Sequence, residues 1–195
     1  QEFTSLDGLS HGARIGTNSL RRQGQLLNVR PDLKIIPITG NIDTRLKKID
    51  TENLAGVVLA EAGLDRLSID LSSYHQLSLK DIIVPAVGQG CLAIECRKAD
   101  ERVRKMLDQI NDPQSAKCIH IEREFMRELG GSCNFPIGGH AYLQDQQIVF
   151  DGLIASPNGE HLIKEVAVPA NKPGVGKVVA DQLLAKDNFG IIEGD

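Results

Sequence analysis

The sequence predicts an α/β fold, with a mostly parallel α/β domain followed by a small α+β domain that holds a three-stranded antiparallel sheet. In the first half, short β-rich runs alternate with helical patterns, which is typical of β-α units and parallel strands. In the last third, three apolar or alternating runs follow one another with turn residues between them, which indicates an antiparallel meander. Between these parts, Pro85, Gly88 and Gly90 interrupt an apolar stretch and indicate a change of direction or of domain.

The parallel part is expected to contain three short strands, each followed by a helix. Arg14–Gly16 is the first strand, and the Thr-Asn-Ser after it supplies cap residues for a helix that begins near Leu20 and must end before Pro31. Asn41 is the expected N-cap of the second helix, which runs through Ile49. The remaining expected elements are strands at 33–38 and 56–60 and a short helix at 61–67.

The middle of the chain is expected to lead from one domain to the next. Residues 92–96 have the pattern of a strand, and residues 101–110 have that of a helix. Asp112 and Pro113 then provide an N-cap and a first-turn proline for a longer helix. The residues that share one apolar face of this helix are Cys118, Ile121, Phe125 and Leu129.

The last third is expected to form the antiparallel sheet and one more helix. Gly130-Gly131 ends the long helix, as glycine does at many helix C-termini. Strands are expected at 139–144, 148–155 and 162–168, with turns at 145–146 and 157–159. The final helix is expected at about 174–186.

Composition and charge exclude several classes of function. Apolar residues make up 41% of the 195 residues and charged residues 25%, as in an ordinary globular protein. A net charge of -4, with five Phe, two Tyr and no Trp, argues against nucleic-acid binding and against binding to anionic membranes. No apolar run reaches membrane-spanning length, and the first ten residues lack the pattern of a signal peptide. Because no Met occupies position 1, the natural start is expected upstream.

The cysteines indicate free thiols and no metal centre. No CxxC pair occurs, and the five histidines form no cluster with metal-ligand spacing. Free thiols favour a reducing, cytoplasmic location. Cys91, Cys96 and Cys118 are predicted to lie in the core. Cys133 stands apart, because the stretch LGGSCNFP places it on an open glycine-rich turn that suits a thiol reached by another molecule.

Three arginines indicate an anion site. Arg21 and Arg22 fall in the first turn of a helix, where cations oppose the helix dipole, but free backbone N–H groups and the hydroxyls of Thr17 and Ser19 favour an anion there. A solvated helix start with no ligand is the equally weighted alternative. Arg45 begins the next helix, and ligands of open α/β sheets gather at the carboxyl ends of the strands. We therefore expect the three guanidinium groups to converge on carboxylates or phosphates; no nucleotide-binding motif is present.

Five motifs carry a family resemblance. They are GTNSLRRQGQLL, GNIDTRLKKID, LAEAGLDRL, PAVGQGCLAIECR and LGGSCNFPIGGHA. In this order and spacing they resemble porphobilinogen deaminase, also called hydroxymethylbilane synthase. That family has three domains, of which the first two are similar to the halves of a periplasmic binding protein. The resemblance implies a terminal tail or linker at 1–11, domain two at 12–87, a crossover into a mostly absent domain one at 88–112, and domain three at 113–195.

The resemblance also implies an activity. Enzymes of the family are transferases of haem and tetrapyrrole biosynthesis that join four porphobilinogen molecules head to tail, releasing ammonia, to give hydroxymethylbilane. The chain grows on a dipyrromethane cofactor linked through a thioether, which the motif assigns to Cys133. The residues that the resemblance assigns to the carboxylates of the cofactor are Ser19, Arg21, Arg22, Arg45 and Arg66, and those that it assigns to the substrate and the growing pyrrole chain are Thr17, Arg21, Arg22 and Arg45.

A missing domain would affect this activity. The family's general-acid aspartate belongs to domain one, so the isolated chain is expected to be inactive. It is also expected to self-associate through the unpaired strand at 92–96, or else to leave residues 88–100 mobile. The competing interpretation is a carboxylate-binding receptor module of the periplasmic type, which would be exported and would not need Cys133. A structural fragment without activity is the third interpretation.

Overall fold

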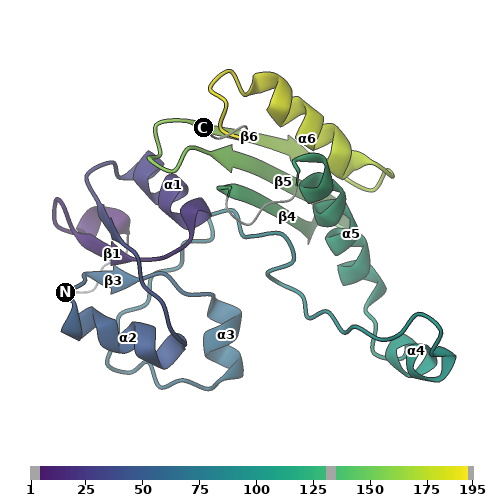
Figure 1. Ribbon diagram of the computed structural model, residues 1–195, viewed down its shortest axis with the longest axis horizontal. Helices are drawn as coiled ribbons and strands as arrows, with labels where there is room; N and C mark the ends of the chain where they lie inside the picture. The colour runs from purple at the N-terminus through teal and green to yellow at the C-terminus, as the bar shows by residue number, and fades with distance from the viewer. Residues whose placement is uncertain (1–4, 131–134, 193–195) are drawn as a thin grey trace.

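The computed structural model describes residues 5–130 and 135–192, which form two sheets with helices packed on them (Figure 1). A parallel sheet with α1 (Leu20–Val29) and α2 (Ile42–Thr51) makes one lobe, and an antiparallel sheet with α5 (Pro113–Glu128) and α6 (Val175–Lys186) makes the other. Helix α1 lies between the two sheets in Figure 1. Its Leu26 packs in the core of the first lobe, and the helix also contacts β5 (Gln147–Ala155) and β6 (Leu162–Ala167) of the other. None of the helices described here is long and apolar enough to cross a membrane.

The first sheet is parallel, as predicted. It has the order β2-β1-β3 and consists of β1 (Arg14–Gly16), β2 (Lys34–Ile36) and β3 (Gly56–Val57). Strands β2 and β3 are shorter than the predicted 33–38 and 56–60. Pro37 follows β2 directly and has no N–H to continue the ladder. All three strands run in the same direction, so the loops that follow them meet at one edge of the sheet.

The helices of this lobe begin where their caps predict. Helix α1 (Leu20–Val29) has Ser19 as its N-cap, and α2 (Ile42–Thr51) has Asn41, whose Oδ1 accepts a hydrogen bond from the N–H of Thr44 at 2.9 Å. Helix α3 (Glu61–Arg66) matches the predicted 61–67. Before them, the short 3₁₀ helix η1 (Leu6–Gly8) buries Leu6 in the core of the lobe, so this part of the predicted tail or linker packs on the domain.

The second sheet is the predicted antiparallel meander. Its order is β4-β5-β6, formed by β4 (Ile137–Gln144), β5 (Gln147–Ala155) and β6 (Leu162–Ala167). Asp145 and Gln146 make the two-residue turn between β4 and β5, and both have positive φ, as this type of hairpin requires.

Helices α5 (Pro113–Glu128) and α6 (Val175–Lys186) pack on this sheet. The predicted apolar face of α5 is buried, and the ring of Phe125 meets that of Phe150 edge to face at 5.2 Å. A Cβ on Gly176 would lie 2.2 Å from the carbonyl oxygen of Ile121, so only glycine permits the close crossing of α5 and α6. Gly130, with a φ of +81°, follows the end of α5 as predicted.

The segment between the lobes differs from the prediction. Residues 92–96 form no strand, because no described strand lies beside them to complete a ladder, and Leu92 and Ile94 are exposed. Helix α4 (Glu101–Asp108) follows and projects from the body of the molecule (Figure 1).

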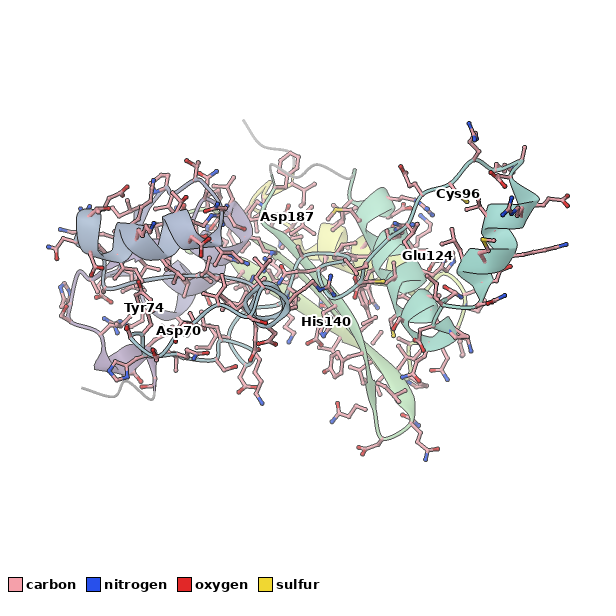
Figure 2. All side chains as sticks on the ribbon, turned by 90° about the horizontal axis from the view of Figure 1, so that it is seen from below. Asp70, Tyr74, Cys96, Glu124, His140 and Asp187 are labelled. Carbon is pink, nitrogen blue, oxygen red and sulfur yellow. The ribbon has the colours of Figure 1, made fainter. Side chains whose placement is uncertain are left out.

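The prediction that three cysteines lie in the core is therefore wrong for two of them. Cys91 and Cys96 are exposed, and Cys118 is buried as expected. Figure 2 shows Cys96 beside α4, at the edge of the molecule.

Candidate carboxylate-binding site

Arg21 lies at the start of α1, where the chain leaves the carboxyl end of β1. Its side chain is buried, and both terminal nitrogens are held by the segment that leads out of the first lobe. Nη1 donates to the carbonyl oxygen of Val84 at 2.6 Å, and Nη2 donates to Oε1 of Gln89 at 3.1 Å. Two of the five guanidinium N–H groups are thus engaged, which leaves the rest of the donor fork for another acceptor.

Arg22 and Arg45 are also held by backbone carbonyls. Nη1 of Arg22 donates to the oxygen of Val58, just after β3, at 2.6 Å. Nε of Arg45 donates to the oxygen of Gly40, in the loop before α2, at 2.8 Å. Each bond uses a neutral acceptor, so it orients the cation without neutralising it.

The three guanidinium groups lie close enough to affect one another. Burial, with a further effect of the charge on Arg22, lowers the pKa of Arg21 to about 10. Burial and the charge on Arg45 lower the pKa of Arg22. Among the described residues, no carboxylate oxygen lies within 4.0 Å of a nitrogen of these three side chains. Desolvated cations with no carboxylate partner favour the binding of an anion.

The other predicted residues are placed differently. Thr17 is buried, and its hydroxyl accepts a hydrogen bond from the N–H of Ser19 at 3.3 Å. The hydroxyl of Ser19 accepts from the N–H of Arg22 at 3.4 Å, as an N-cap does. Arg66 lies exposed in the last turn of α3 and makes no side-chain hydrogen bond or ion pair with the residues that the structure describes. Cys133 lies outside the described residues.

Sequence reasoning missed three side chains around the segment 84–89. Gln25, one turn after Arg21, is fully buried and contacts the backbone of Val84. Gln89 belongs to the motif AVGQG, whose composition indicates only a turn. Glu122 is buried on α5 and accepts hydrogen bonds from the N–H of Gly88 at 2.6 Å and from the N–H of Ala141 at 2.9 Å.

Residues 84–89 are thus held by side chains of both lobes. The polar position of Glu122 on an otherwise apolar helix face was the signal that could have revealed its role. In the described part of the chain, no group of three or more His, Cys, Asp or Glu side chains could hold a metal ion.

Two family models match the sequence. One, described as porphobilinogen deaminase, dipyromethane cofactor binding domain, matches residues 1–105. The other, described as porphobilinogen deaminase, C-terminal domain, matches residues 116–185. The first match ends within α4 and the second begins within α5, so the loop that joins these helices lies between the two matches.

Curated relatives have the same name. The porphobilinogen deaminase of Limosilactobacillus reuteri (strain DSM 20016) is 76% identical over all of this chain, which covers 64% of that protein. That of Listeria monocytogenes serotype 4a (strain HCC23) is 42% identical over 98% of the chain and 63% of the relative. That of Syntrophotalea carbinolica is 44% identical over 91% of the chain and 57% of the relative. The chain thus spans less than two thirds of the length of these relatives, and it belongs to the porphobilinogen deaminase family.

Proposed function

We propose that this chain supplies the carboxylate-binding and cofactor-attachment parts of a transferase that condenses four porphobilinogen molecules to hydroxymethylbilane in the cytoplasm. The observation that carries the proposal is the group of three guanidinium side chains, Arg21, Arg22 and Arg45, for which the described residues provide no carboxylate. Membership of the porphobilinogen deaminase family supports the same conclusion.

The chemistry of the substrate matches this site. Porphobilinogen carries an acetate and a propionate group, and each added unit brings two more carboxylates. Guanidinium forks bind carboxylates bidentately and fix their orientation, which an ammonium group does not do. The free N–H groups at the start of α1 add to the attraction for negative charge. These residues bind and orient the carboxylates, while the departing ammonia needs a proton donor elsewhere.

The dipyrromethane cofactor fits the same residues, because its side chains are also carboxylates. When bound, it supplies the pyrrole end to which the first substrate is joined. We assign its attachment to the thiol of Cys133 and the binding of its carboxylates to Ser19, Arg21, Arg22, Arg45 and Arg66. Thr17 joins the first three of these arginines in our assignment of the substrate site, through its hydroxyl.

The exposed middle segment supports a further part of the proposal. Leu92, Ile94, Met106 and Ile110 are large apolar side chains with exposed fractions of 70%, 61%, 53% and 69%. We propose that residues 88–112 complete a domain formed largely by other parts of the enzyme, and that the lobe at 12–87 faces it like half of a periplasmic binding protein. The chain alone is then inactive and self-associates through these side chains.

Intact mass of the complete enzyme tests the cofactor assignment. Cys133→Ser is expected to remove the mass of the dipyrromethane and the colour with Ehrlich's reagent. Cys91→Ser, Cys96→Ser and Cys118→Ser are the matched controls and are expected to retain both. Cofactor that remains on Cys133→Ser contradicts the assignment, and a wild-type enzyme without any covalent pyrrole favours a carboxylate receptor instead.

A further inference from the structure

The side chain of Gln25 binds both backbone polar groups of Val84. Its Oε1 accepts a hydrogen bond from the N–H of Val84 at 2.7 Å, and its Nε2 donates to the oxygen of Val84 at 3.2 Å. Nε2 also donates to the oxygen of Arg21, one turn earlier on α1, at 3.1 Å. Only 1% of the Gln25 side chain is exposed, so its amide is dedicated to these contacts.

The same carbonyl of Val84 orients Arg21. It accepts from Nη1 of Arg21 at 2.6 Å, the shortest of the bonds made by this guanidinium. The second bond, from Nη2 to Gln89, reaches the same segment five residues later. The direction of the planar guanidinium fork therefore depends on where the peptide of Val84 is held, and Gln25 holds it.

Val84 is anchored separately on its apolar side. Its side chain packs with Leu153 and Ala155 of β5, and a Cβ on Gly138 of β4 would lie 3.1 Å from the Cβ of Val84. This packing does not involve Gln25. Loss of the Gln25 amide would thus free the peptide of Val84 to turn while its side chain stays in place.

From this geometry we propose that Gln25 is a positioning residue, which fixes the peptide of Val84 and through it the orientation of the Arg21 guanidinium toward a carboxylate ligand. The carboxylate ligand is part of the proposed function, on which this inference rests. Gln25 does not itself contact the ligand; it acts through Val84 and Arg21.

The first test needs no ligand. In the ¹⁵N-labelled chain, the Nη protons of Arg21, identified by their absence in Arg21→Lys, should give separate NMR signals because two acceptors restrict the rotation of the guanidinium. Gln25→Met keeps the volume and removes the hydrogen bonds, so these signals should merge or broaden. Gln23→Met is the matched control, because Gln23 lies on the same helix and donates instead to the oxygen of Pro157 at 2.9 Å.

The second test is a double-mutant cycle on kcat/KM for porphobilinogen in the complete enzyme. Gln25→Met is expected to lower kcat/KM about tenfold, the effect of one weakened bond to a charged group. In the Arg21→Lys background the same substitution is expected to change little, because its effect passes through the guanidinium. Gln25→Glu retains the acceptor for Val84 N–H and removes both donors, and it serves both tests if Gln25→Met does not fold.

The two tests separate this inference from the proposed function. Unchanged Arg21 signals in Gln25→Met overturn the inference. The inference also fails if Gln25→Met lowers kcat/KM by the same factor in the Arg21→Lys background as in the wild type. If Arg21→Lys leaves turnover at the wild-type level, the proposed carboxylate site fails, while the NMR signals still decide whether Gln25 orients Arg21.

Discussion

The two ends of α1 carry arginines in opposite electrostatic settings. At the C-terminal end, Arg30 faces the negative end of the helix dipole and binds Asp32 through two bonds, Nε to Oδ1 at 2.7 Å and Nη2 to Oδ2 at 2.8 Å. At the N-terminal end, Arg21 and Arg22 oppose the dipole and have no carboxylate among the described residues. The difference separates a structural arginine, satisfied within the chain, from arginines that a ligand must satisfy.

The largest expected effect is on turnover. Arg22→Lys in the complete enzyme removes the donor fork but keeps the charge, so it should lower kcat/KM about 10- to 150-fold, which corresponds to about 1.5–3 kcal/mol for a lost charge-assisted bond. The melting temperature should change little. Arg30→Lys is the matched control: it should lower the melting temperature and leave kcat/KM unchanged. Normal turnover in Arg22→Lys would show that Arg22, like Arg30, has a structural role and does not bind the ligand.

The second prediction concerns how much a bound carboxylate ligand stabilises the fold. A carboxylate ligand that binds only the folded chain stabilises it by about 2.7 kcal/mol at 100 times its Kd. Porphobilinogen should therefore raise the melting temperature of the wild type and of Arg30→Lys. Thermal unfolding of Arg21→Lys and Arg22→Lys should show a smaller rise. An equal rise in all four proteins would show that the ligand binds elsewhere.

The third prediction concerns the middle of α1, where the helix packs closely against the second lobe. A Cβ on Gly24 would lie 2.6 Å from the oxygen of Ser156 and 3.2 Å from the Cβ of Ala155. Gly24→Ala should destabilise the fold by about 1–3 kcal/mol through overpacking, partly offset by a gain of about 1 kcal/mol in helix propensity. In Gly63→Ala of α3 the new Cβ meets only the flexible end of Ile42, at 3.2 Å, so urea unfolding should show a smaller change.

The smallest expected effect is the pH dependence at the C-terminal end. Hydrogen bonds from Arg30 and from the N–H of Gly12 hold the pKa of the Asp32 carboxyl well below its usual range. A lowered pKa in the folded state stabilises the fold above the unfolded value of about 3.9, and this stabilisation is lost as the pH falls through the folded pKa. Urea midpoints of wild type and Asp32→Asn should therefore differ near neutral pH and converge in acid. A constant difference across this range would mean that Asp32 acts by packing alone.

Much of the fold could be predicted because its signals are local. Ser19, Asn41 and Asp112 cap the helices that they were expected to cap, and the Asp145-Gln146 turn sets the register of the hairpin. Residues 92–96 form no strand although their pattern predicts one, because such a pattern shows only that a segment suits a sheet. Whether a neighbouring strand is present depends on the rest of the fold. No described strand lies beside this segment, and Cys91 and Cys96 are therefore exposed.

For the site, the sequence by itself determined the residue types and the helix start: arginines at positions 21, 22 and 45, each in the loop or first turn after a parallel strand. Only the tertiary structure decided what holds them. Gln25 and Glu122 stand 59 and 34 residues from the backbone N–H groups that they bind in the segment 84–89. A hydrogen bond between a side chain and a distant backbone leaves no periodicity in the sequence, because any residue can supply the N–H or the carbonyl. Packing of the two lobes around that segment is what brings these groups within bonding distance.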